Sequence, residues 1–529
     1  MERAAKQLKK INYLRRWGKA GLALILLALF TFLYTQTIAD PDLWGHLRFG
    51  RDIWESGQVS KQDPYSYLSA GQEWINHEWL AEVLFWGTFA LAGTKGLVLL
   101  KLAVGLLTTM LLYIHLRRRV GALGAAFPLL LLTPLPLWRF LVTIRPQILT
   151  LLCFTLVLLI LQRAEQGGLR NLWLLPPLFA AWANCHGGFL AGLGVLILWA
   201  GVRVVLGMAR RGEVALRLPE VLTLVGPVAA SAGATLLNPY GPGLWAFLLR
   251  TATVSREEIT EWQPLVLLSS AGLSYLVPLG ITAAGLLYSQ RERRPALVAV
   301  YACVALLPLL AARHLALFAV SATILSGEHV YDLWRRQSPL KSITQRAFSP
   351  WHFLPWLVPL SVYGVGVLVP LTLLRSSEIR SPLSCIQLPQ AYYPVRAVAL
   401  LRAATPAGNL ATDFDWGEYV LWHLGPQVKV SMDGRRETVY SDEVYAQNLR
   451  FVRGEGNWDA LLTTYPTDMA LVRADGPADN LLRLKPGWDL VYEDSVSALF
   501  VREDSPLREQ LQAASLPEIP YDGRGLCFP

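Results

Sequence analysis

The chain has 529 residues, of which 53% are hydrophobic and 16% are charged, and its formal net charge is +9. A soluble domain has about 25% charged residues, so this composition excludes an ordinary soluble protein and predicts membrane-spanning helices. Lys and Arg gather in short segments between the apolar runs, as in the cytoplasmic loops of membrane proteins, and this placement argues against a nucleic-acid-binding protein.

Apolar runs of bilayer length predict about eleven membrane-spanning helices. The first run follows a basic flank, and we interpret it as a retained helix because no small-x-small cleavage site closes it. A cytoplasmic N-terminus places every later basic cluster on the cytoplasmic side, including Arg117–Arg119 and Arg291, Arg293 and Arg294. The predicted spans are residues 20–38, 97–116, 121–138, 147–163, 171–186, 188–206, 217–236, 272–289, 295–312, 314–328 and 353–374.

Residues 79–93 (WLAEVLFWGTFALAG) are apolar enough to be mistaken for a further span. They carry Glu82 between Trp79 and Trp86, and a crossing here would invert every later loop. We therefore interpret this segment as an interfacial helix on the outer membrane surface. The unusual polar motifs then fall in outer loops, so any chemistry is expected to face outward.

The first outer loop, residues 39–96, begins with the sequence ADPDLWGH. Pro41 suits the first turn of a helix and Asp40 the cap position before it. In such a helix Asp42 and His46 are four residues apart and share a face. Two carboxylates and an imidazole can deprotonate a hydroxyl or bind a cation. The alternative is a capped helix in which Asp42 only complements the helix dipole.

The rest of this loop has an amphipathic stretch to Gly57, the polar motif Asn76-His77-Glu78 and the interfacial helix. The layout resembles the first periplasmic loop of the GT-C fold glycosyltransferases, which include protein O-mannosyltransferases and the aminoarabinose transferases of lipid A. In that class a catalytic Asp follows the first helix, and an amphipathic helix ends at a Gly about fifteen residues later. The resemblance covers residues 1–375 and implies that Asp42 is catalytic, with Asp40 as a second acid.

Two departures from the class occur in this loop. The class often has Asp-Glu where this chain has Asp42-Leu43, and the Glu-Lys-Pro-Pro-type motif is replaced by Asn76-His77-Glu78. The resemblance implies a polyprenyl-phosphate-linked sugar as donor. It does not extend to the C-terminal region.

Other polar residues of the outer loops are candidates for substrate binding. Arg145 begins a span, where a guanidinium can hold a lipid-linked phosphate, and Arg313 lies in a short hairpin between apolar flanks, where a charge is costly. The alternative for each is a local role, because interfacial Arg side chains snorkel and a Gly-Gly pair is often only a turn. The substrate-binding candidates are His46, His77, Glu78, Arg145, Asn184, His186, Arg313 and His314.

Residues 376–529 have the composition of a globular α/β domain, and an odd number of spans places them outside. The motifs 413–419 (DFDWGEY) and 433–436 (DGRR) are rich in acids, aromatics and arginines, so they form either a sugar-binding surface or a domain core with a charged hairpin. Cys385 and Cys527 flank this domain, and we predict a disulfide between them in an oxidising compartment.

These observations predict a multi-pass protein of the bacterial inner membrane that transfers a sugar, with inversion, from a polyprenyl phosphate to a glycan, lipid or protein acceptor. Asp42 would act as the general base, and Arg145 or Arg313 would stabilise the departing phosphate. No metal ion is required, although a divalent cation is compatible with the carboxylates. Two alternatives stay open: a transporter or flippase of a lipid-linked glycan, and a non-catalytic assembly protein with a binding ectodomain.

Overall fold

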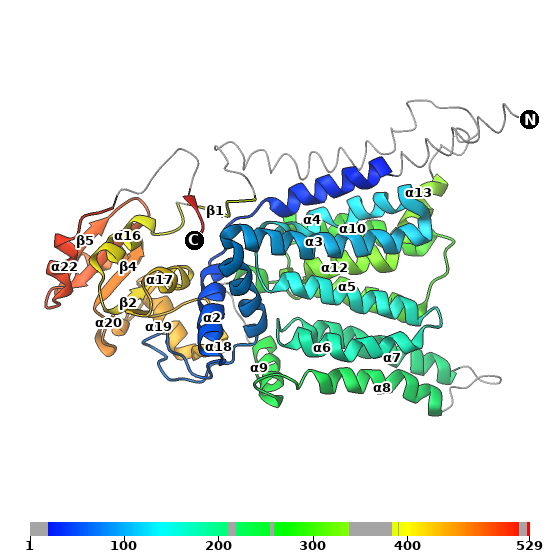
Figure 1. Cartoon of the computed structure of the whole chain (residues 1–529), viewed down its shortest axis with the longest axis horizontal. Helices are drawn as coiled ribbons and strands as arrows, with labels where there is room; N and C mark the ends of the chain where they lie inside the picture. Colours follow the sequence, from blue (N-terminus) through cyan, green and yellow to red (C-terminus); the bar gives the residue numbers. More distant parts are fainter. Residues whose placement is uncertain (1–19, 210–217, 254–258, 338–382, 390, 518–525) are drawn as a thin grey trace, which may run out of the picture.

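The computed structural model describes residues 20–209, 218–253, 259–337, 383–389, 391–517 and 526–529. The helices form an elongated bundle, and an α/β domain packs against one end of it (Figure 1). The predicted basic N-terminal flank, the last predicted span (353–374) and the predicted domain boundary at residue 376 lie outside the described residues.

The helices of the bundle follow the apolar runs of the sequence. Among the described residues, four helices are long and apolar enough to cross a membrane, and shorter apolar helices accompany them. The chain is therefore a membrane protein, and the number of its spans stays a prediction. The bundle helices are Ala20–Thr35, α3 (Trp79–Leu132), α4 (Pro134–Val142), α5 (Gln147–Ala164), α6 (Leu175–Ala183), α7 (Phe189–Ala209), α8 (Leu218–Ala234), α10 (Ser270–Tyr288), α11 (Pro295–Leu306), α12 (Leu315–Ser321) and α13 (Gly327–Gln337).

Helix α3 is interrupted where the predicted interfacial segment ends. Gly93 has φ 58° and ψ −148°, a backbone conformation that residues with a Cβ rarely adopt. The chain then turns back so tightly that a Cβ on Gly96 would lie 2.1 Å from the Thr88 carbonyl oxygen. A second break at Gly121, with φ 81°, separates the predicted spans 97–116 and 121–138. The first part of α3 is thus a separate helix joined to the bundle by a sharp bend.

The C-terminal domain is built on a five-stranded mixed sheet of order β3-β2-β4-β6-β5. Strand β2 pairs in parallel with β3 and β4, and β6 pairs antiparallel with β4 and β5. The hydrophobic side chains of β4 and β6 are buried. The strands are β2 (Gly408–Thr412), β3 (Val428–Val430), β4 (Met469–Arg473), β5 (Trp488–Glu493) and β6 (Ser497–Arg502), and the main helices are α16 (Val395–Ala404), α17 (Gly417–Leu424), α18 (Arg436–Val439), α19 (Asp442–Arg453) and α22 (Leu507–Ala513).

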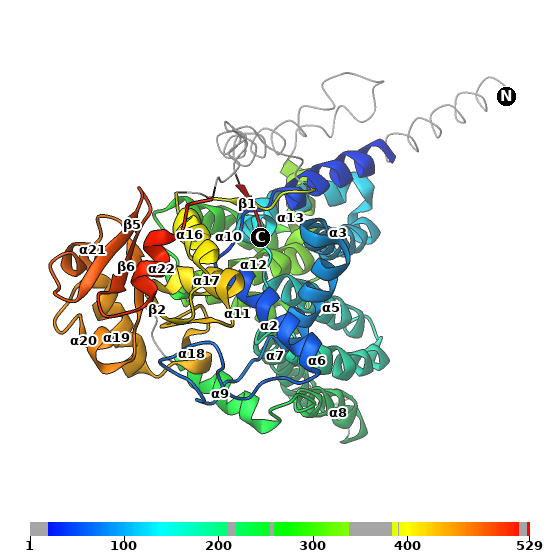
Figure 2. The same ribbon diagram turned by 60° about the vertical axis from the view of Figure 1, so that its left-hand side comes forward.

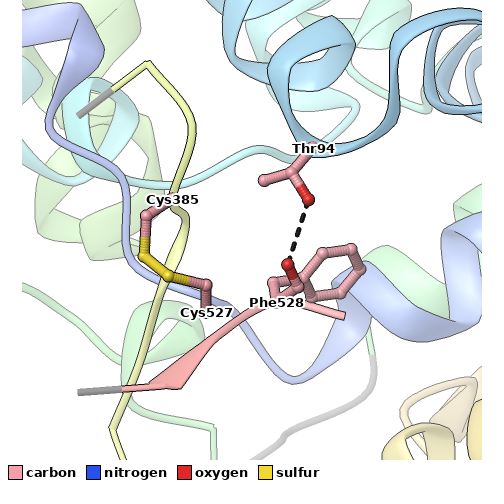
Figure 3. The surroundings of a disulfide bond; sticks show 4 residues. All are labelled: Thr94, Cys385, Cys527 and Phe528. Atoms are coloured by element: carbon pink, nitrogen blue, oxygen red, sulfur yellow. Dashed lines mark hydrogen bonds between the residues drawn. A yellow bond between two sulfur atoms is a disulfide. The ribbon is translucent and has the colours of Figure 1, made fainter. Parts of the chain in front are cut away.

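A disulfide joins the two ends of this domain. Cys385 and Cys527 are bonded, with their Cα atoms 5.1 Å apart, so the predicted disulfide is confirmed (Figure 3). The short strands β1 (Gln387–Leu388) and β7 (Leu526–Cys527) pair beside it. Thr94 donates a hydrogen bond of 3.0 Å to the Phe528 carbonyl oxygen, which fixes the C-terminal segment on the bend of α3.

The first outer loop and the C-terminal domain share one hydrophobic core. Helix α2 (Asp42–Ser56) lies between α3 and the domain in both views (Figures 1 and 2). Trp44 on α2 is fully buried, and its ring packs against those of Tyr393, Tyr419 and Phe528, at centroid distances of 4.8 to 5.0 Å. The loop and the domain therefore form a single packed unit.

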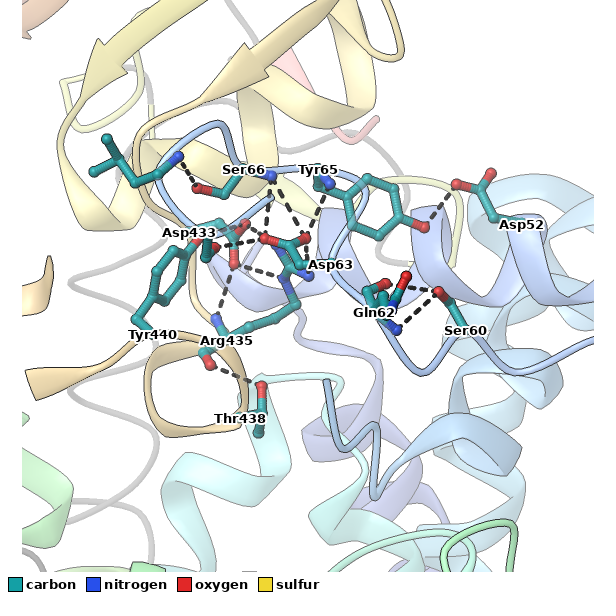
Figure 4. A network of polar contacts seen from close by, with 12 residues as sticks. Asp52, Ser60, Gln62, Asp63, Tyr65, Ser66, Asp433, Arg435, Thr438 and Tyr440 are labelled. Atoms are coloured by element: carbon teal, nitrogen blue, oxygen red, sulfur yellow. Dashed lines mark hydrogen bonds and ion pairs between the residues drawn. The ribbon is translucent and has the colours of Figure 1, made fainter. Parts of the chain in front are cut away.

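A buried ion network also connects the loop to the domain (Figure 4). The Arg435 guanidinium lies 2.8 Å from an Asp63 carboxylate oxygen and 2.6 Å from one of Asp433, and the side chains of both acids are fully buried. Tyr440 donates a further hydrogen bond to Asp433. The interpretation of the DGRR motif as part of a domain core is thus confirmed.

Candidate active site

Helix α2 begins as its sequence predicts. The first helical residue is Asp42, after Pro41, and the Asp42 N–H donates to the Asp40 carboxylate over 3.3 Å. Asp40 therefore caps the first turn with its side chain. The pKa of Asp42 is raised to about 7, because burial of the carboxylate outweighs the attraction of the Arg145 guanidinium.

Arg145 is the centre of the charged groups around this helix start. Its guanidinium lies 2.7 Å from Asp40, 3.2 Å from Asp42 and 3.3 Å from Glu261. Glu261 comes from the short helix Thr260–Trp262, far along the chain. One cation thus faces three carboxylates, and Arg145 fixes the positions of Asp40 and Asp42 relative to each other.

A buried lysine holds the two chain segments that carry these charges. Lys101 on α3 donates to the Gln36 carbonyl at 3.0 Å, to the Thr37 hydroxyl at 2.6 Å and to the Leu141 carbonyl at 2.9 Å. Just beyond, the Ile38 N–H donates to the Val142 carbonyl over 2.9 Å. The segment before Asp40 is therefore fixed beside the segment before Arg145.

The C-terminal domain adds a buried carboxyl group to the same place. Glu418, in the first turn of α17, accepts a hydrogen bond of 3.0 Å from the Gly45 N–H. A Cβ built on Gly434 would lie 2.7 Å from both an Asp42 oxygen and a Glu418 oxygen, so the two carboxyl groups are close together. Burial and the negative charge of Asp42 raise the pKa of Glu418 well above its usual value. Burial and the nearby Asp42 charge thus favour the protonated form of Glu418.

The polar motif of the first loop lies in a second cluster. Glu78 is 3.5 Å from His186 Nε2 and 3.8 Å from His77 Nε2. The Gly188 N–H donates to His186 Nδ1 over 2.9 Å, which places the ring proton on Nε2, facing Glu78. The structure therefore brings three predicted substrate-binding residues, His77, Glu78 and His186, into one cluster.

Two predicted substrate-binding residues make internal contacts instead. His46 does share the α2 helix with Asp42, but its Nδ1 lies 3.4 Å from Glu82 on α3. Asn184 accepts a hydrogen bond from Trp79 Nε1 and donates to the carbonyl oxygens of Ala180 and Leu237. These contacts give Asn184 a role in joining helices, and they orient the start of α3.

A cavity of about 960 Å³ lies next to both clusters. Asp40 and Arg145 line this cavity, whereas Asp42 is not part of its wall and contacts Arg145 at 3.2 Å. Arg313 stacks over the ring of Trp262, with its guanidinium carbon 4.2 Å from the ring centroid. Apolar side chains from α4, α7 and α12 form much of the remaining wall. The polar residues of the wall include Asp40, His77, Arg145, His186, Glu261, Arg313 and His314.

The carboxylates of the site converge on an arginine. Among the described residues no three His, Cys, Asp or Glu side chains are grouped so that they could hold a metal ion. Arg145 takes the position between Asp40, Asp42 and Glu261 that a cation would need. A cation bound by these three acids would therefore have to displace the guanidinium.

Two acids of the site were missed by the sequence analysis. Glu261 lies in a polar outer segment, but nothing in that segment links it to Arg145. Glu418 belongs to the DFDWGEY motif, which the sequence marks as either a sugar surface or a core. Covariation of these positions with Arg145 and Gly45 would be the signal to look for, because each pair is in direct contact.

No protein-family model matches the sequence, and the search of curated proteins found no significant match. Several solved protein structures are similar to this one in fold. The archaeal oligosaccharyltransferase AglB from Archaeoglobus fulgidus, in complex with an inhibitory peptide and a dolichol-phosphate, has a TM-score of 0.57 at 11% identity, over 94% of this chain and 78% of that one. The oligosaccharyltransferase of the same organism, in complex with Zn and sulfate, has a TM-score of 0.51 at 12% identity, over 85% and 68%.

ArnT from Cupriavidus metallidurans, bound to undecaprenyl phosphate, has a TM-score of 0.51 at 15% identity, over 92% of this chain and 98% of ArnT. At these identities the likeness is one of fold. The match extends over most of both chains. The chain is thus a membrane protein of the GT-C fold, the class that its first outer loop resembles.

Proposed function

We propose that the protein is a glycosyltransferase that moves a sugar from a polyprenyl-phosphate donor to an acceptor hydroxyl at the outer face of a membrane, with inversion. The observation that carries this proposal is the position of Asp42. Its carboxylate contacts Arg145, which lines a large cavity with a partly apolar wall, and its pKa is raised to about 7. A general base works best when its pKa lies near the working pH.

The transfer needs one base and one site for the leaving group. Asp42 takes the proton of the acceptor hydroxyl while the hydroxyl oxygen attacks the anomeric carbon. The bond between that carbon and the phosphate oxygen breaks, and its electron pair stays on the phosphate. Since the hydroxyl oxygen attacks the anomeric carbon on the face opposite to the departing phosphate, the configuration of that carbon inverts. The leaving group is a polyprenyl monophosphate.

Arg313 is the cation best placed for this phosphate. It lines the cavity together with His314, and its guanidinium lies over the ring of Trp262. Arg145 is less suited, because its guanidinium already meets three carboxylates. An Arg in a cavity shielded from water stabilises developing negative charge strongly. The apolar wall suits the isoprenoid chain, as the undecaprenyl phosphate bound to ArnT suggests by analogy.

The same arrangement supports an outward orientation. Helix α2, which begins at Asp42, and the C-terminal domain lie at the same end of the bundle (Figure 1), and Arg145 contacts Asp42 there. A flippase would need polar groups near the middle of the membrane. From the basic loops we infer that the C-terminal domain lies outside the cytoplasm, and from the resemblance to the aminoarabinose transferases that the membrane is the bacterial inner membrane.

The decisive variant is Asp42→Asn. Asn keeps the size of Asp and most of its ability to sit at a helix start, so the cost in stability should be no more than about 1 kcal/mol. Loss of a general base should slow transfer by about 10²–10⁴-fold. The assay uses purified protein, a pool of polyprenyl-phosphate sugars and native membrane acceptors.

Asp40→Asn is the matched control, because Asp40 caps the helix and pairs with Arg145. It should retain much more activity than Asp42→Asn. The reverse result would assign the base to Asp40. Normal transfer by both variants would remove the catalytic assignment, and a wild type that uses no lipid-linked donor would favour the assembly-protein alternative.

A further inference from the structure

A second cavity lies in the helical bundle, away from the C-terminal domain. Its volume is about 220 Å³, and it is bounded by α3, α5, α10, α11 and α13. Helix α13 is at the end of the bundle opposite to the domain (Figure 1). The charged and titratable side chains of its wall are Arg119, Arg291, Arg294, Glu292, Tyr301, Glu328 and His329.

One of the three arginines is fully paired within the protein. Arg119 lies 2.6 Å from a Glu328 oxygen, and it donates to Gln162 over 2.8 Å. Arg119 and Glu328 therefore neutralise each other. The net charge of the wall then depends on Arg291, Arg294 and Glu292.

Arg294 is not fully paired. Its Nη1 atom is buried and has no hydrogen-bond partner among the described residues. The carboxylate of Glu292 is 3.8 Å from Nη2, and the Glu292 side chain is 79% exposed, so water weakens this contact. Arg291 lies on the same wall and adds a second positive charge. The guanidinium of Arg294, whose side chain is 24% exposed and lines the cavity, is therefore only partly paired within the protein, and such a group can take a further hydrogen-bond acceptor.

The arginine side chains of the cavity wall indicate the kind of ligand that it can bind. The planar fork of a guanidinium matches the oxygens of a phosphate group. The cavity lies between α10, which ends at Tyr288, and α11, which begins at Pro295. A basic pocket between helix ends, at the surface of a membrane, is suited to the headgroup of an anionic lipid. Leu286, Leu297 and Val298 form an apolar part of the wall.

We propose that this cavity binds a phosphate-bearing anion, held by Arg294 and Arg291, at the inner surface of the membrane. The phosphate comes either from the headgroup of an anionic phospholipid or from free inorganic phosphate. This site is separate from the candidate active site, and the proposal does not rest on the proposed function.

The test uses the full-length protein, purified in detergent and delipidated. Binding of phosphatidylglycerol and of phosphatidylcholine is titrated by native mass spectrometry, and binding of inorganic phosphate by calorimetry. Arg294→Gln and Arg291→Gln should each weaken binding about tenfold, the effect of losing one charge-assisted hydrogen bond. Arg335→Gln is the matched control, because its side chain is 64% exposed and does not line the cavity.

Preferred binding of phosphatidylglycerol that both cavity variants weaken supports a lipid headgroup. Binding of phosphate alone, weakened in the same way, supports a free anion. The proposal is overturned if the wild type binds neither ligand, or if the cavity variants bind as the control does. Arg294 precedes α11, so unliganded melting temperatures are compared first, and Arg291→Gln decides the result if Arg294→Gln does not fold.

Discussion

The buried network around Arg435 predicts how strongly the C-terminal domain is held on the first outer loop. The Asp63 and Asp433 side chains are 0% exposed, and that of Arg435 is 5% exposed. Arg435→Met keeps an apolar chain of similar length but leaves two buried carboxylates without a cation. Removal of one partner from a buried ion pair costs about 3–5 kcal/mol. Because Asp63 belongs to the loop and Asp433 to the domain, this loss of stability should weaken the contact between the first outer loop and the C-terminal domain.

The measurement is limited proteolysis of the purified protein in detergent. A loss of about 3–5 kcal/mol makes the open state of the contact at least about 100-fold more populated. Cleavage should accelerate by the same factor when opening and closing are faster than cleavage. Arg502→Met is the control, because Arg502 is 42% exposed and pairs with Asp504 on the surface of the same domain. If Arg435→Met is cleaved no faster than Arg502→Met, the network does not hold the domain in place.

Three further predictions concern the site and its orientation. Transfer should accelerate as the pH rises through about 7, because Asp42 must lose its proton to act as a base; a rate that is independent of pH there would contradict this role. In the same assay, Glu418→Gln should retain activity, since Gln has nearly the shape of Glu and its side-chain oxygen can still accept the hydrogen bond of the Gly45 N–H. Gly45→Ala should lose activity, since its Cβ would lie 2.1 Å from a Glu418 oxygen; equal activities of the two variants would argue against this contact. A membrane-impermeant maleimide should label Asp504→Cys but not Glu292→Cys from outside, although both side chains are exposed; the opposite pattern would invert the topology.

Features that depend on residues close together in the chain could be predicted from the sequence. The helix start at Asp42 follows from Asp40 and Pro41, and the bend at Gly93 follows from a residue that tolerates a positive φ. Apolar runs predicted the bundle helices, because backbone groups inside a membrane must be paired within a helix. The disulfide between Cys385 and Cys527 could be predicted because both residues flank the same domain.

The composition of the site was decided by contacts between distant parts of the chain. Glu418 reaches Gly45 across 373 residues, and Glu261 reaches Arg145 across 116. Such contacts depend on how the domain packs on α2, and no local pattern encodes that packing. The face of α2 shared by Asp42 and His46 was predicted, but His46 pairs with Glu82 because α3 lies beside it. The sequence by itself thus determined where the candidate base lies, and only the tertiary structure decided which charges surround it.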